Sequence, residues 1–168
     1  VYIEKSEGWL FVPYHNAIRK YAMGRFKDLL MAVAKSPAML VYLDNVDNEG
    51  DFGNVNFARE LMELHTVSVT GGYTPADIRN VQRAFSGWEM SWEGSSKGTF
   101  RFDPDKHSTL PKSLMGTPIP GNGLGGVKEG LWVIDYLANH PNTAKFIAKK
   151  LLRFFLAYDP SDAQINAV

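Results

Sequence analysis

The first third of the chain carries apolar residues at helical spacing. Between residues 14 and 35 they recur every three or four positions, which places them on one face of an α-helix. These residues are Ile18, Ala22, Phe26, Leu29, Leu30 and Val33. Ser36-Pro37 ends the pattern, and a short helix over 37–43 is predicted to follow, because proline at a first helical position loses no hydrogen bond.

The middle of the chain alternates a polar loop with two helices. Residues 44–54, DNVDNEGDFGN, are rich in turn-forming Asp, Asn and Gly and predict a surface loop. A helix over about 55–66 comes next. Gly71-Gly72 interrupts it, Thr74 is suited to cap, and Pro75 to open, a second helix reaching about residue 88. The two are expected to form a helical hairpin.

The last part predicts one small sheet and two further helices. Aromatic residues alternate around a glycine-bearing turn over about 89–102, which is typical of a β-hairpin and is the only sheet expected. Prolines and glycines make 103–126 a loop. Helices are predicted over 127–139 and 141–158. The fold class is therefore mostly α, a helical domain with several amphipathic helices and one small β-hairpin.

The ends of the sequence favour a fragment. The first residue is Val1 rather than methionine, and the final stretch SDAQINAV resembles the opening turns of another helix. We expect one helical domain over 1–168 that belongs to a longer protein, with any export signal upstream.

Composition excludes several functional classes. Eighteen Lys and Arg balance eighteen Asp and Glu, so no overall field attracts nucleic acid. The chain has no cysteine, which removes disulfides and thiolate metal sites. Its longest apolar runs, such as 151–158, fall short of the roughly 20 residues that a bilayer span needs, so no transmembrane segment is predicted.

The helix NFARELMELHT, 56–66, offers the first candidate chemistry. Arg59, Glu60 and Glu63 point away from its apolar side, whereas His65 falls within the apolar arc. His65 and Glu63 therefore cannot share a ligand. His65 is either a core histidine bonded near the helix C-terminus or an acid or base facing an internal pocket. Glu60, Glu63 and His65 are the catalytic candidates.

Two arginines on the next predicted helix need an acidic neighbour. Arg79 and Arg83 stand four residues apart and repel each other on one side of that helix. Glu60 and Glu63 are the nearest carboxylates in sequence, which predicts a charge network between the two helices. The functional alternative is a site for phosphate, sulfate or carboxylate.

The loops suggest metal ligands. Asp103, Asp105 and His107 alternate, so an extended chain would project them to one side as ligands for a divalent metal such as zinc, manganese or iron. The alternative is a turn at Asp103-Pro104 with an exposed His107. Lys112 binds an anion or is only solvated. The 44–54 loop resembles a calcium loop but lacks the closing glutamate, since Asn56 stands there.

The last long helix is amphipathic. Lys145, Lys149 and Arg153 form a row beside an apolar face, so the helix lies on a membrane surface or, more commonly, packs into a core. The apolar face comprises Ile147, Leu151, Phe154, Phe155 and Tyr158.

Several motifs together resemble a known bacterial family, domain of unknown function 1800. The resemblance is collinear over about residues 18–160 and rests on YAMGRFKDLLMAVAKSPAMLVYLDN, NVNFARELMELHTVSVTGGYTPADI, RAFSGW, FRFDPDKHSTLPKSLMG and HPNTAKFIAKKLLRFF. It implies a larger, mostly helical protein, exported to the periplasm or cell exterior and often encoded beside a sulfatase-like protein. It adds Arg25 and Asn56 to the candidate ligand-binding residues.

The chain departs from the family pattern at two acidic positions. Asn54-Val55-Asn56 stands where Asn-Glu-Asn is usual, and residues 107–112, HSTLPK, lack the usual aspartate after the histidine. If those acids act in relatives, this copy is impaired.

These observations lead to one functional hypothesis and one alternative. The polar residues of the central helix and the 103–112 loop are expected to converge on a pocket that binds, or hydrolyses, an anionic or saccharide-like ligand. Arg59 or Arg79 would hold the anion, Glu60 or Glu63 would act as acid or base, and His107 as ligand or proton carrier. The alternative is a non-catalytic helical scaffold or cell-surface assembly partner.

Overall fold

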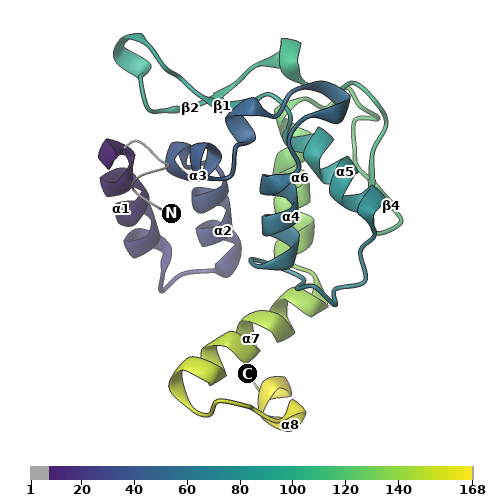
Figure 1. Ribbon diagram of the computed structural model, residues 1–168. Helices are drawn as coiled ribbons and strands as arrows, with labels where there is room; N and C mark the ends of the chain where they lie inside the picture. The colour runs from purple at the N-terminus through teal and green to yellow at the C-terminus, as the bar shows by residue number, and fades with distance from the viewer. Residues whose placement is uncertain (1–7, 168) are drawn as a thin grey trace.

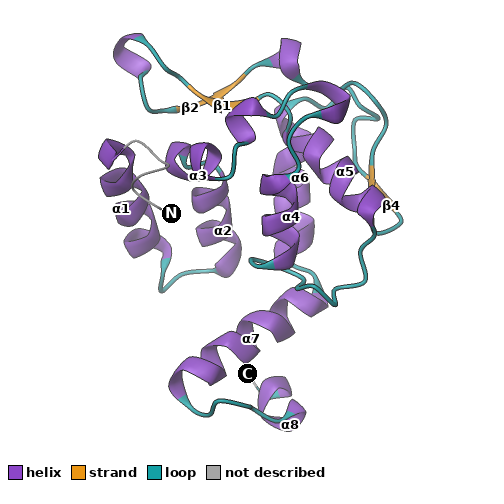
Figure 2. Ribbon diagram, in the orientation of Figure 1, coloured by secondary structure: helices purple, strands orange, loops and turns teal. Residues whose placement is uncertain are grey.

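A computed structural model describes residues 8–167, and it is mostly helical, as predicted (Figure 2). The α-helices are α1 (Phe11–Tyr21), α2 (Phe26–Ala34), α3 (Pro37–Tyr42), α4 (Asn56–Glu63), α5 (Pro75–Phe85), α6 (Val127–Ala138), α7 (Pro141–Phe155) and α8 (Asp162–Asn166). The strands are β1 (Trp88–Met90), β2 (Phe100–Phe102), β3 (Ser113–Leu114) and β4 (Thr117–Pro118).

Helices α2, α4, α5 and α6 enclose the main core, with α1 and α3 beside them (Figure 1). An aromatic chain runs through this core: Phe85 meets Phe57 at 5.0 Å and Trp88 at 4.8 Å between ring centroids, all edge-to-face. Trp88 then meets Phe100 of β2 at 5.0 Å. Edge-to-face pairs add to the stabilisation from burial, so this chain ties the small β-hairpin to the helices.

The predicted helix over 14–35 is wrong in one respect, because it is two helices. The backbone turns at residues 22–25, where the Gly24 N–H donates to the Tyr21 carbonyl at 2.9 Å and Arg25 is extended. Glycine is a poor helix former, and here it allows α1 to fold back against α2. Helix α2 buries Leu30 and Ala34, whereas no residue of α1 is fully buried.

The 44–54 loop is not merely a surface loop, since two of its amides are buried. The Asn48 side chain donates to the Gln82 carbonyl at 2.9 Å and accepts from the Gln82 side chain at 2.7 Å. Asn45 donates to the Trp88 carbonyl at 2.8 Å. Buried amides are stable only when they are paired, so this exchange fixes the loop against α5 and β1.

The predicted β-hairpin is confirmed, and a second small sheet was missed. Strands β1 and β2 are antiparallel with Trp88 opposite Phe102. Strands β3 and β4 form a short antiparallel pair inside the segment expected to be loop. Asp77 holds this pair to α5, because its carboxylate accepts the Met115 N–H at 2.7 Å.

Helices α7 and α8 form an arm that projects away from the other helices (Figure 1). Helix α7 begins at Pro141 as predicted and ends at Phe155, and α8 confirms the helical character of the final residues. Over residues 8–167, no helix has both the length and the hydrophobicity needed to cross a membrane.

Candidate functional site

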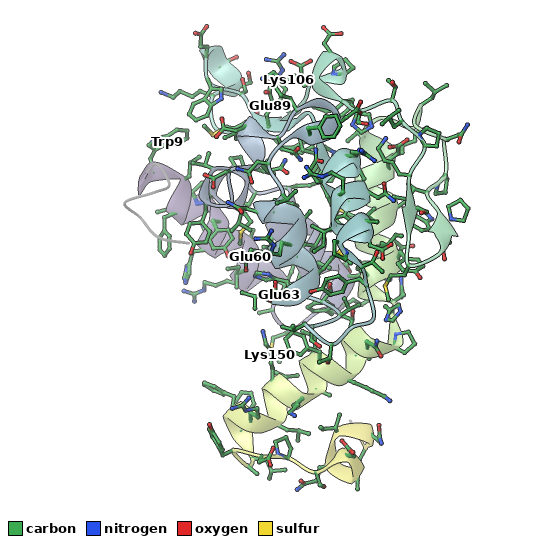
Figure 3. All side chains as sticks on the ribbon, turned by 45° about the vertical axis from the view of Figure 1, so that its right-hand side comes forward. Trp9, Glu60, Glu63, Glu89, Lys106 and Lys150 are labelled. Carbon is green, nitrogen blue, oxygen red and sulfur yellow. The ribbon has the colours of Figure 1, made fainter. Side chains whose placement is uncertain are left out.

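The charged side of α4 faces outward and forms no salt bridge within residues 8–167 (Figure 3). Arg59 is exposed, while Glu60 and Glu63 are partly buried. Partial burial raises the pKa of the Tyr73 hydroxyl; nearby Glu63 raises it further, and Arg59 opposes the shift. These groups thus form a surface cluster, separate from the residues of the 103–112 loop.

Of the two roles that the sequence left open for His65, the structure favours a histidine bonded near the end of α4. Its Nδ1–H donates to the Glu60 carbonyl at 2.8 Å, an oxygen that also accepts the Leu64 N–H at 3.0 Å at the end of α4. Its ring borders a cavity of about 20 Å³ that is otherwise apolar, with Leu30, Phe57 and Leu61 among the lining residues. Such a volume holds about one water molecule, so it leaves no room for a substrate.

Arg79 and Arg83 do not form the predicted charge network with the glutamates of α4. Arg79 donates to the Gly53 carbonyl at 3.1 Å, and Arg83 donates to the Asp51 carbonyl at 3.2 Å. The reason is that the 44–54 loop covers this side of α5 and brings its carbonyl groups to the guanidinium groups. The two arginines therefore hold a loop in place.

The two candidates taken from the family resemblance also have local partners. Arg25 pairs with Asp28 at 2.9 Å on the surface, with 82% of its side chain exposed. The Asn56 side chain donates to the Asp44 carboxylate at 3.0 Å and so joins the start of α4 to the preceding loop.

The proposed metal ligands do not converge. Residues Pro104–Lys106 form a tight helical turn, which ends the extended alternation on which the prediction depended. Asp103 accepts the Asp105 N–H at 3.0 Å and pairs with Arg101 at 3.1 Å, whereas Asp105 is exposed and His107 is buried. Within the described part of the chain, no three His, Asp or Glu side chains are placed to hold a metal ion together.

Glu89 holds this turn against the β-hairpin. Its buried carboxylate pairs with Lys106 at 3.1 Å and with Arg101 at 3.4 Å. The hydrogen bond to Glu89 raises the pKa of the Lys106 ammonium group. Figure 3 shows Glu89 and Lys106 together, well apart from Glu60 and Glu63.

A buried ionic cluster lies behind the turn, and its central residue, Glu129 of α6, was missed. Glu129 is fully buried; its Oε2 lies 2.7 Å from Lys112 Nζ and 3.2 Å from His107 Nε2. Glu129 shares a helix face with the buried Val133 and Leu137, four and eight residues later. A single carboxylate within such an apolar stripe is the sequence feature that would have indicated Glu129 as a buried, paired residue.

Every polar group of this cluster has further partners. Lys112 also donates to the Ser108 and Leu110 carbonyls at 2.7 and 3.0 Å. The other Glu129 oxygen accepts the Gly125 N–H at 3.0 Å. His107 Nδ1 lies 2.8 Å from the Ser86 carbonyl, too close for anything but a donated hydrogen bond. The cluster therefore secures the 107–126 loop to α5 and α6 and presents no free group to a ligand.

Unlike the buried cluster, helix α7 borders a solvent-accessible groove of about 600 Å³. Four cationic side chains from α7 line it: Lys145, Lys149, Lys150 and Arg153. The turn at residues 67–70 and helix α8 complete its walls, and Asp162 is the one carboxylate in the lining.

These cations have no anionic partner within residues 8–167. Lys145, Lys149 and Arg153 recur every fourth residue and so share one side of α7. Lys150 donates to the Leu64 carbonyl at 2.7 Å and lies 4.4 Å from the Phe146 ring. Burial lowers the Lys150 pKa. The spacing of Lys145, Lys149 and Arg153 in the sequence predicted that they form a row, but only the structure shows that this row borders a groove.

The whole chain, residues 1–168, matches a family described as protein of unknown function (DUF1800). The chain belongs to that family. This confirms the resemblance read from the motifs. Comparisons with curated proteins and with solved structures gave no match. The role of this DUF1800 member must therefore be argued from its own geometry.

Proposed function

We propose that the chain binds an anionic, saccharide-like ligand in the groove along α7. The observation that carries the proposal is the set of four cations around one cavity of about 600 Å³, opposed by a single carboxylate. A cavity of this size accommodates a small oligosaccharide. Clustered cations without counter-ions repel one another, so an anion in the groove is stabilised by all of them.

The remaining groups in the groove suit a sulfated or carboxylated sugar. Arginine and lysine donate hydrogen bonds to such anions. Ser68 and Thr70 carry hydroxyl groups 3.2 Å apart at the groove wall, and Asn166 adds an amide, so sugar hydroxyls have both donors and acceptors. A sulfated ligand also accords with the sulfatase-like neighbour and the periplasmic or extracellular location that the family resemblance implies; both belong to the proposal.

Binding is favoured over hydrolysis. Glycoside hydrolysis ordinarily requires two carboxyl groups flanking the bond, and Asp162 is alone in this lining. The catalytic candidates Glu60 and Glu63 lie on α4 and are not among the residues that line the groove.

Calorimetric titration with a short heparin-derived oligosaccharide tests this proposal. The Lys149→Gln/Arg153→Gln variant should bind about tenfold more weakly, since the loss of roughly 0.7 kcal/mol at each of two exposed contacts amounts to about 1.4 kcal/mol. The matched control is Lys20→Gln/Lys128→Gln, which removes two exposed cations outside the groove. A desulfated oligosaccharide of equal length should bind more weakly to the unmodified chain. Equal losses in both variants, or no binding at all, would refute the proposal.

A scaffold role is the second candidate, and the buried polar networks favour it. Asn48 of the 44–54 loop and the motif residues Arg83, His107 and Lys112 bond within the protein and fix its loops. If the oligosaccharide does not bind, this role is the one left by the geometry. It predicts that replacing Lys112 alters stability, whereas replacing Lys149 alters nothing measurable.

A further inference from the structure

The end of α7 and the residues after it expose an unusually apolar tip. Phe154 is 81% exposed, Phe155 78%, Leu156 63% and Tyr158 83%. The two phenylalanine rings meet edge-to-face at 4.8 Å. Soluble proteins seldom leave large apolar side chains in contiguous patches, and those that do generally bind another surface there.

The charge beside this tip is mainly positive, with Asp159 directly after Tyr158 as the nearest carboxylate in sequence. Residues 141–158 contain Lys145, Lys149, Lys150 and Arg153 but no Asp or Glu, in a chain whose formal net charge is zero. Arg153 lies next to the apolar residues and 4.9 Å from the Tyr158 ring. A surface that is both apolar and negatively charged therefore complements the tip.

We propose that this tip, Phe154, Phe155, Leu156 and Tyr158, docks on an anionic phospholipid bilayer. An amphipathic helix with aromatic and leucine side chains on one side and lysines or arginines on the other lies in the interface of such a bilayer. Phenylalanine and leucine enter the acyl boundary, and the long cationic side chains extend toward the headgroups.

The shape of the molecule and the sign of the charge both favour a bilayer. Figure 1 shows α7 and α8 projecting from the other helices, so within residues 8–167 the arm can meet a flat surface without obstruction. A second copy of the chain is a poorer partner, because its tip would bring four more cations against the first four.

This inference goes beyond the oligosaccharide groove and does not require it. Leu151 and Phe155 project from α7 on roughly the opposite side from Lys149. A helix is about 10 Å wide and the Debye length at 0.1 M salt is also about 10 Å, so groove cations still attract the lipid surface across the helix.

Sedimentation of the full chain with vesicles tests the inference. One set of vesicles is phosphatidylcholine alone, and the other contains about a third phosphatidylglycerol, a composition with the surface charge that attracts basic segments. We expect at least tenfold stronger partitioning to the anionic vesicles, with a fall at high salt. Phe154→Ser/Phe155→Ser should lose about tenfold or more of that partitioning, since each ring gives up buried apolar area.

The matched control is Met23→Ser/Phe52→Ser, which changes two apolar residues of similar exposure, 98% and 84%, away from the arm. It should partition like the unmodified chain. Equal partitioning by tip and control variants, or equal binding to both kinds of vesicle, would overturn the inference. Absence of vesicle binding by the unmodified chain would also overturn the inference. If light scattering then shows a dimer that the tip variant abolishes, the tip binds a second copy of the chain rather than a bilayer.

The oligosaccharide titration on the same samples keeps the two proposals apart. The tip variant should retain oligosaccharide affinity, because neither phenylalanine lines the groove. If the unmodified chain binds the oligosaccharide but not the anionic vesicles, only the docking inference is contradicted. If it binds the anionic vesicles but not the oligosaccharide, only the groove proposal is contradicted.

Discussion

Lys112 and Lys149 are the same residue type in two opposite environments. The Lys112 side chain is fully buried, and its ammonium group lies 2.7 Å from Glu129. Lys149 is exposed on α7 and borders an open groove with one carboxylate. The first ion is balanced by the protein itself, whereas the second remains available to something outside it.

This difference distinguishes charged residues that hold the fold together from charged residues that are available to bind a ligand. A buried ion must be paired, because leaving water costs several kcal/mol. An exposed cation pays no such cost and needs no internal partner. The motif residues most prominent in the sequence, His107 and Lys112, belong to the first kind. The plainer row on α7 belongs to the second and is the better place to look for a ligand.

Removing Glu129 should have the largest effect on the buried side of this comparison. Glu129→Ala leaves Lys112 and His107 without their shared carboxylate, and we expect a loss of about 3–5 kcal/mol in unfolding free energy. Urea denaturation followed by circular dichroism measures it. Glu63→Ala on the outward side of α4 is the control and should change stability by less than about 0.5 kcal/mol. Similar losses in both would show that the cluster is not what holds the 107–126 loop.

The buried amide network should be the next most sensitive feature. Asn48→Ala leaves the Gln82 amide short of an acceptor, which costs about 1–3 kcal/mol. Hydrogen exchange should also quicken over residues 44–54. Asp47→Ala, an exposed change in the same loop, serves for comparison. If the two variants exchange alike, then the amides do not fix the loop.

Replacing Gly130, which packs against the Trp88 ring, should have a smaller effect on stability, and the direction of the change is informative. Gly130→Ala would gain up to about 1 kcal/mol from helix propensity. The added carbon would lie 2.6 Å from the Trp88 ring, and overpacking of this kind costs about 1–3 kcal/mol. We therefore expect net destabilisation, seen as a lower melting temperature. A higher melting temperature would mean that the Trp88 ring moves freely.

The groove should show the smallest change in stability. Lys149→Gln should leave the unfolding free energy within about 0.5 kcal/mol, as is usual for exposed substitutions. The same variant should weaken oligosaccharide binding, measured by calorimetry. A large loss of stability would place Lys149 with Lys112, among the structural charges.

Local patterns were sufficient where neighbouring residues decide the structure. Thr74 and Pro75 begin α5 as predicted, with a reciprocal cap between Thr74 and Asp77. The alternating aromatics near residues 89–102 form the hairpin. The apolar face of α4 packs inward, since Phe57 and Leu61 are buried. Caps, turns and periodicity act within a few residues, and so they can be read from the sequence.

Partners that are distant in the sequence were decided only by the tertiary structure. The sequence predicted Glu60 and Glu63 as partners of Arg83, but in the folded chain Arg83 donates to the Asp51 carbonyl instead. It likewise brings Glu129 to Lys112, seventeen positions away, and the turn at residues 67–70 to the cations of α7. An ion's partner depends on which segments pack together. Helical spacing fixes the side of a helix on which a residue lies, but not what that side meets.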